Sequence, residues 1–68
     1  MNDEVFNLEL RKFLKQFGVT SQREVEHAVA TAIEQRKLQG GDTLKARAVL
    51  EIDGLGTVAT VEGTIALS

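Results

Sequence analysis

Residues 44–68 contain two runs of alternating apolar and polar residues that can pair as an antiparallel β-hairpin in one register. A shift of one residue would place every apolar position opposite a polar one, so the register is well specified. The pattern predicts strands over 44–52 and 57–67, with Gly54 and Leu55 as the two central residues of a type II′ turn. On the apolar side the predicted pairs are Leu50 with Ala59, Ala48 with Val61, Ala46 with Gly63, and Leu44 with Ile65; on the other side they are Arg47 with Glu62, Lys45 with Thr64, and Val49 with Thr60.

The chain has 68 residues, which is enough for a single domain over 1–68 with one small core. Cores of this size are usually reinforced by disulfides, by a metal or by a partner chain. The sequence has no cysteine and only one histidine, His27, so we expect neither a disulfide nor a structural metal. Self-association is the remaining means of stabilisation, and a homodimer is therefore expected.

The formal net charge of −2 gives no general attraction to nucleic acid or to a membrane surface. The start of the chain, Met1-Asn2-Asp3-Glu4, lacks the basic and apolar regions of a signal peptide. No apolar run approaches the roughly 18 residues that a membrane span needs. These features favour a cytoplasmic protein without a membrane segment.

A first helix is predicted over residues 3–17. Asn2 is suited to the N-cap, and Gly18 is suited to end the helix in the left-handed conformation. The apolar residues follow the spacing of one helix face: Phe6, Leu10, Phe13, Leu14 and Phe17.

A second helix is predicted over residues 22–38, separated from the first by a tight corner at 18–20. Ser21 and Glu24 have the spacing of a capping box, with Ser21 at the N-cap. Gly40 and Gly41 are expected to stop this helix, and Arg36 and Lys37 to lie near its C-terminus. Its apolar face is narrow and carries mostly small side chains: Val25, Ala28, Val29, Ala32 and Ile33.

These elements predict an α+β fold of order ααββ, in which a helical hairpin packs on one face of the C-terminal β-hairpin. A two-stranded sheet is marginal alone, and both of its strands are edges. Strand 57–67 carries one charge, Glu62, and would aggregate if it were left open. We expect it to pair with the same strand of a second copy to give a four-stranded sheet. The alternative is a monomer in which a helix or the sheet twist covers that edge.

No constellation of residues predicts catalysis, so we expect no enzymatic activity, no catalytic residue and no cofactor. There is no cysteine nucleophile, and the glycine pairs do not stand between a strand and a helix as a phosphate-binding loop requires. Glu24 and His27 form one Glu-x-x-His, which is half of a di-iron signature, and no second one is present. A solvated histidine on a polar helix face is the simpler interpretation.

The alternative function is DNA binding, because residues 10–38 resemble the helix-turn-helix of bacterial repressors. That resemblance would place Gln22, Arg23 and Glu26 at the bases and Lys12 and Lys15 at the phosphates. The hairpin would correspond to the wing of a winged-helix DNA-binding protein. Its tip at 51–56 is acidic, where contact with DNA phosphates needs Lys or Arg. We therefore favour a non-enzymatic protein-interaction module and do not expect nucleic acid as the partner.

The mixed outer face of the hairpin is the candidate contact surface for an unidentified protein partner. Its residues alternate along the two predicted strands: Lys45, Arg47, Val49, Val58, Thr60, Glu62 and Thr64.

Three segments resemble a family of small bacterial proteins of unknown function and of about this length. The resemblance extends over essentially the whole chain and implies a free-standing single domain. It implies no activity, ligand or catalytic residue. The segments that carry it are 2–7, 10–24 and 44–47.

Overall fold

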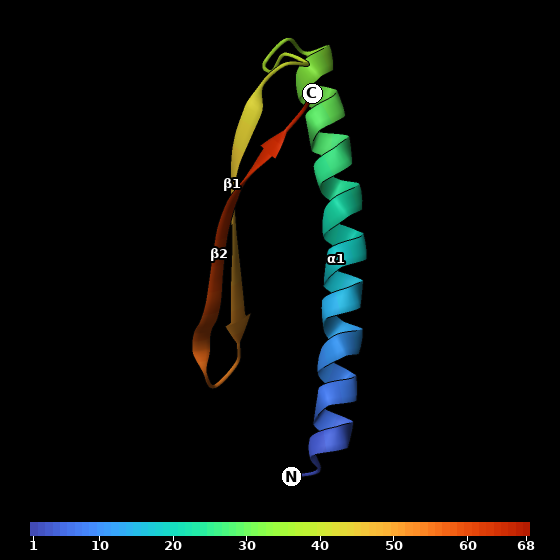
Figure 1. The fold of residues 1–68 in the computed structure, drawn as a ribbon, viewed down its shortest axis with the longest axis vertical. Coiled ribbons are helices and arrows are strands. Elements are labelled where there is room, and N and C mark those ends of the chain that lie inside the picture. Colours follow the sequence, from blue (N-terminus) through green and yellow to red (C-terminus); the bar gives the residue numbers. More distant parts are fainter. The chain divides into compact units, whose positions relative to one another are not determined.

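The computed structural model describes all residues, 1–68, and contains one helix followed by two strands (Figure 1). The elements are α1 (Asp3–Glu34), β1 (Thr43–Ile52) and β2 (Gly56–Ala66). They belong to two compact units, Met1–Lys37 and Leu38–Ser68. The fold is α+β, but its order is αββ. The predicted helical hairpin, and with it the order ααββ, is wrong.

The helix runs without interruption through the corner that was predicted at 18–20. Gly18 does not adopt a positive φ, so it is an interior helical residue and not a C-cap. Ser21 is likewise inside the helix and does not cap a second one. The physical reason is that a glycine inside a helix costs only about 1 kcal/mol relative to alanine, which a helix of 32 residues can tolerate.

The N-terminus of α1 is capped as predicted. The side-chain oxygen of Asn2 accepts hydrogen bonds from the backbone N–H groups of Glu4, at 3.0 Å, and Val5, at 3.1 Å. Asp3 and Glu4 lie in the first turn, where negative charge is favourable. The cap thus satisfies two of the backbone donors that the first turn leaves free.

The C-terminus of α1 differs from the prediction of a helix that reaches residue 38. The backbone N–H of Arg36 donates to the carbonyl oxygen of Ile33 at 3.0 Å, and that of Lys37 donates to Ala32 at 2.8 Å. This pair of bonds is a Schellman motif, and its left-handed position is held by Arg36, with φ of 61°. Both basic residues therefore lie beyond the helix, and no basic residue stands in its last turn.

Gly40 and Gly41, which were expected to stop the helix, lie instead in the turn that leads into β1. Asp42 organises this turn. One of its carboxylate oxygens accepts from the backbone N–H of Gln39 at 2.9 Å, and its own backbone N–H donates to the Gln39 carbonyl oxygen at 3.0 Å. The Asp42 carbonyl oxygen then accepts from Leu67 at 3.0 Å, which extends the hairpin ladder by one pair.

The predicted hairpin register is confirmed at every pair that was named, from Leu44 with Ile65 to Leu50 with Ala59. The alternation of apolar and polar residues was sufficient to specify it. Between Leu50 and Glu51 the register shifts, because Glu51 pairs with Thr57 and leaves Val58 as the extra residue of a bulge.

The turn of the hairpin is longer than predicted. The backbone N–H of Leu55 donates to the carbonyl oxygen of Ile52 at 2.9 Å, which places Gly54 third in the turn and not second. Gly54 and Gly56 have φ of 87° and 74°. The prediction of a type II′ turn centred on Gly54 and Leu55 is therefore wrong. Two residues with positive φ and the bulge together accommodate the extra length.

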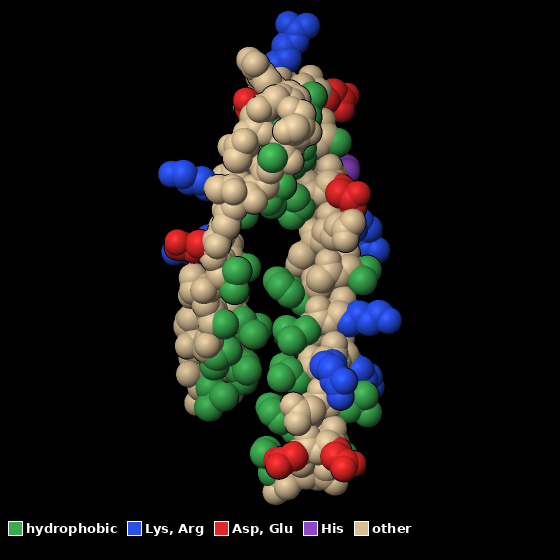
Figure 2. Space-filling model, viewed as in Figure 1, with side chains coloured by type: hydrophobic (Ala, Val, Ile, Leu, Met, Phe, Trp, Pro, Cys, Tyr) green, Lys and Arg blue, Asp and Glu red, His purple; other side chains and the backbone are tan.

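No residue of the chain is buried. Hydrophobic side chains gather along α1 and along the hairpin, as Figure 2 shows. Half of the surface of Phe6 and of Phe13 is exposed, at 50% and 51%. Each unit therefore carries an apolar face that it does not cover from within itself.

Candidate interaction surfaces

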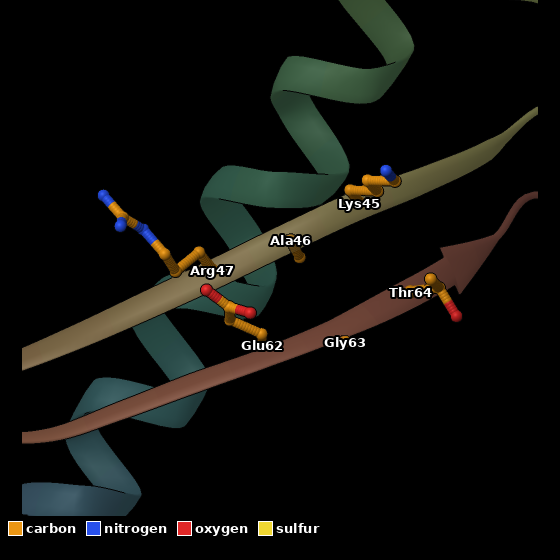
Figure 3. A pocket seen from close by; sticks show the side chains of 6 residues that line it. All are labelled: Lys45, Ala46, Arg47, Glu62, Gly63 and Thr64. Carbon is orange, nitrogen blue, oxygen red and sulfur yellow. The ribbon is translucent and has the colours of Figure 1, made fainter.

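The outer hairpin face is the surface made by Lys45, Arg47, Val49, Val58, Thr60, Glu62 and Thr64. All seven residues are exposed, and the ladder places Arg47 opposite Glu62 and Lys45 opposite Thr64. In Figure 3 the Arg47 side chain extends away from the strands while the Glu62 carboxylate lies toward β1. The one ion pair of the structure lies elsewhere, between Lys12 and Glu9 of α1 at 3.6 Å. Both charges at this point of the hairpin are therefore free for a partner.

An open hollow of about 500 Å³ lies in the middle of the hairpin (Figure 3). Ala46 and Gly63, which face each other in the ladder, line it between the flanking residues of the outer face. Charged and polar side chains flank it on both strands. The lining residues are Lys45, Ala46, Arg47, Glu62, Gly63 and Thr64.

The free edge of β2 presents its backbone in a defined pattern. Leu67 donates to Asp42, so this pair is hydrogen-bonded, and in an antiparallel ladder such pairs alternate with pairs that are not. Alternate residues from Leu67 back to Ala59 of β2 therefore bond to β1, and the backbone N–H and carbonyl groups of Thr60, Glu62 and Thr64 point away from β1. The edge therefore offers a row of unpaired donors and acceptors over residues 60–66.

The apolar face of α1 extends over the whole helix. Because successive helical residues are about 100° apart, Phe17, Ser21 and Val25 lie on one face and join the two stripes that were predicted separately. Sequence reasoning missed this continuity, although the regular spacing from Phe17 to Val25 carries the signal. The face, called the α1 stripe below, contains Phe6, Leu10, Phe13, Leu14, Phe17, Ser21, Val25, Ala28 and Ala32.

The N-terminal part of α1 also forms an open depression of about 600 Å³. Leu10 and Leu14 contribute apolar surface to it, and Arg11 lines it as well. The Arg11 Nε donates to the carbonyl oxygen of Asn7 at 3.5 Å, one turn earlier in the same helix. The depression therefore combines apolar surface with a guanidinium group along one side of α1. Its lining residues are Glu4, Asn7, Leu8, Leu10, Arg11 and Leu14.

The residues predicted to contact DNA are brought together on one side of α1, but not as a helix-turn-helix. That motif needs a turn between two helices so that the second can enter the major groove, and residues 10–34 form one straight run of helix. The helix-turn-helix resemblance is therefore wrong. On the continuous helix, the residues in question share the polar face opposite the α1 stripe: Lys12, Lys15, Gln22, Arg23 and Glu26.

Side chains that could hold a metal ion do not cluster. No group of three or more His, Asp or Glu residues has a suitable arrangement. Glu24 and His27 lie one turn apart on α1, where both are exposed. The helix is also not apolar over a length that would let it cross a membrane.

Comparison with known proteins yields one match. A family model described as a family of unknown function matches residues 1–68. Neither a curated protein nor a solved structure matches the chain. The surfaces described above are therefore the basis for a functional assignment.

Proposed function

The chain belongs to DUF6494, a family of unknown function, and we propose that it is a small, non-enzymatic protein-interaction module that self-associates. We place it in the cytoplasm of a bacterium, in line with its cysteine-free sequence. The observation that carries the proposal is the free edge of β2, which offers a row of unpaired backbone donors and acceptors over residues 60–66. A core as small as this chain can build is usually reinforced, and a second copy is one source of reinforcement.

The free edge of β2 supports this proposal. A twofold-related copy of β2 would satisfy the backbone groups of residues 60–66 and extend the sheet to four strands. Only Glu62 carries a charge along this strand, whereas β1 carries Lys45 and Arg47 at the positions that would discourage such pairing. Homodimerisation through the β2 edge is thus favoured over pairing through β1.

The outer hairpin face would then be doubled by the second copy. A continuous sheet presents the unpaired charges of Arg47 and Glu62 from both chains on one surface. We assign the contact with a further protein to this surface because its charges have no partner within the chain. The chemistry of the surface suits a partner that offers both acidic and basic groups.

The test is the solution mass by light scattering over a range of concentrations, combined with hydrogen exchange. The proposal predicts twice the mass of one chain and slow exchange at the backbone N–H groups of Thr60, Glu62 and Thr64. A monomer at the highest concentration, with fast exchange at these groups, would contradict it.

Proline substitution tests the edge separately. Glu62→Pro removes a donor from the free edge but leaves the β1–β2 hydrogen bonds intact, so it should weaken the dimer without unfolding the hairpin. Arg47→Pro is the matched control, because the residue stands directly opposite and its N–H points away from β2. The Arg47→Pro variant should dimerise as the original protein does. Equal effects of both substitutions would exclude pairing through β2.

A further inference from the structure

The backbone groups that point away from β1 are arranged symmetrically about Gly63 of β2. We infer that β2 pairs antiparallel with β2 of a second copy about a twofold axis at Gly63, so that Glu62 of each copy lies opposite Thr64 of the other. This inference rests on the proposed self-association through the β2 edge and adds the register of the contact. The register decides which side chains of the two copies meet.

The length of the free edge is the first observation. Ala66 belongs to it together with the three residues described above, because its pair with Thr43 is not hydrogen-bonded. Toward the turn, the bulge at Val58 interrupts the alternation. The free edge therefore has a defined length, and its midpoint is Gly63. Its residues are Thr60, Glu62, Thr64 and Ala66.

The hydrogen bonds available to each register favour an axis at this midpoint. In an antiparallel pair, a residue whose backbone groups point to the partner strand lies opposite another such residue. With the axis at Gly63, every residue of the free edge finds a partner, because Thr60 meets Ala66 and Glu62 meets Thr64. An axis one residue to either side leaves one of them without a partner in the strand. The register centred on Gly63 therefore forms the most hydrogen bonds.

Charge favours the same register. Glu62 is the only charged residue of β2. An axis at Glu62 would set two carboxylates directly opposite each other, which is destabilising. An axis at Gly63 sets the Glu62 carboxylate opposite the Thr64 hydroxyl, which can donate a hydrogen bond to it. On the apolar side of the sheet the same register pairs Val61 with Ile65, both β-branched.

The edge of β1 does not permit an equivalent pairing. Its outward-pointing residues alternate from Thr43 to Val49, so their midpoint is Ala46. An axis at Ala46 would set Lys45 opposite Arg47 of the second copy, and an axis one residue to either side would set one of these cations opposite itself. Like charges directly opposite each other are destabilising. The second copy is therefore expected at β2.

The register also determines how the outer hairpin face continues across the axis. Glu62 of one copy then lies between a cation of its own chain and, beyond Thr64 of the other copy, a cation of that chain. The hollow of each copy includes Gly63, the residue at the axis, so the two hollows adjoin (Figure 3). Each row across the four strands reads Arg47, Glu62, the partner's Thr64 and the partner's Lys45.

Single cysteines test the register, since the chain has no cysteine of its own. At the axis the two Cα atoms are about 4.5 Å apart, within the range that a disulfide spans. Gly63→Cys should therefore form a covalent dimer in a glutathione redox buffer, measured on non-reducing gels over time. A Cβ at this position has open space, and its φ is not positive.

The neighbouring positions provide the comparison. In this register, residues 62 and 64 are each displaced by two positions from the same residue of the other copy, which gives a Cα separation of about 8 Å. That separation is too long for a disulfide without backbone movement. Glu62→Cys and Thr64→Cys should therefore link at least about tenfold more slowly than Gly63→Cys. Faster linkage at either position would overturn the inference.

Ala46→Cys is the matched control for the edge. Ala46 lies directly opposite Gly63 in the ladder and at the midpoint of the β1 edge. It should stay unlinked when the sheet is extended through β2, because the two β1 strands are then separated by both copies of β2. Linkage at Ala46 in preference to Gly63 would show pairing through β1 and overturn the inference.

Isotope-filtered NMR on the unsubstituted chain gives an independent measurement. In a mixture of labelled and unlabelled copies, α-protons are closest between chains at the pairs that are not hydrogen-bonded. The register predicts contacts between copies from Gly63 to Gly63 and from Val61 to Ile65. A contact from Val61 to Gly63 would place the axis at Glu62 and overturn the inference.

Failure of the inference and failure of the proposed function give different results. A dimer that is weakened by Glu62→Pro but links fastest at Glu62→Cys or Thr64→Cys would overturn the register and leave self-association through β2 standing. A monomer at the highest concentration, with no linkage at any position, would contradict both. A dimer that links fastest at Gly63→Cys would support both.

Discussion

The backbone N–H of Lys37 donates a 2.8 Å hydrogen bond to the carbonyl oxygen of Ala32, and this bond closes α1 across an arginine and not across a glycine. Arg36 holds the left-handed position of the motif, with φ of 61°. A residue with a Cβ is strained there by about 1 kcal/mol. Arg36→Gly should therefore raise the free energy of unfolding by about 1 kcal/mol, measured by urea denaturation at a fixed protein concentration.

The neighbouring residue supplies the control for this substitution. Gln35 has φ of −83°, a conformation that any residue adopts without strain. Gln35→Gly should therefore lower the stability, because glycine adds flexibility to the unfolded chain and there is no backbone strain at this position for it to relieve. A loss of stability in Arg36→Gly would show that the helix does not end in this motif.

The N-cap at Asn2 offers a second prediction. Asn2→Ala removes an acceptor from two backbone N–H groups and should cost about 1 kcal/mol of stability. Asn2→Asp keeps the acceptor and adds a favourable charge at the helix N-terminus, so it should retain the stability of the original. Thermal unfolding of both variants measures the difference. Equal losses of stability in Asn2→Ala and Asn2→Asp would mean that the hydrogen bonds of the cap do not stabilise the helix.

The hairpin turn offers a third prediction. Gly54 has φ of 87°, so Gly54→Ala should destabilise the protein by about 1 kcal/mol even though space for the added Cβ is open. Gly63→Ala is the comparison, because Gly63 also has open space but no positive φ. It should raise the stability slightly, since glycine weakens a strand interior. Chemical denaturation of the two variants should give shifts of opposite sign.

The hairpin register could be predicted from the sequence because one observation, the alternation of residues, decides it. With a side-chain period of two, only one register keeps Ala48 opposite Val61 while Arg47 faces Glu62. The turn was less certain, because Gly54, Leu55 and Gly56 allow several turns of similar length. The bulge at Val58 has no sequence signal of its own, and it follows from the turn that was chosen.

The helix was divided wrongly because local signals at residues 18–21 were weighed without the phase of the apolar residues. A glycine followed by a Ser-x-x-Glu sequence is a reasonable helix boundary when it is considered alone. The spacing from Phe17 through Ser21 to Val25 continues the same face, and cooperative propagation of the helix outweighs one unfavourable glycine. The stripe becomes visible only when the helix is continuous.

The candidate surfaces could be identified only in part from the sequence. The residues of the outer hairpin face follow from the register, and their exposure is confirmed. The hollow lies where the ladder sets Lys45 and Arg47 opposite Thr64 and Glu62, and the sequence analysis did not identify it. The direction of the β2 edge groups depends on the hydrogen bond between Leu67 and Asp42, which no residue pattern predicts.

The most direct test of the continuous helix is the unfolding midpoint of Gly18→Ala. Gly18 lies inside α1 with ordinary helical geometry, and an added Cβ would meet no other atom within 4 Å. Alanine should therefore raise the free energy of unfolding by about 0.5–1 kcal/mol. If a turn separated two helices at this position, with Gly18 in the left-handed conformation, alanine would lower the stability instead. A gain supports the single helix, whereas a loss contradicts it.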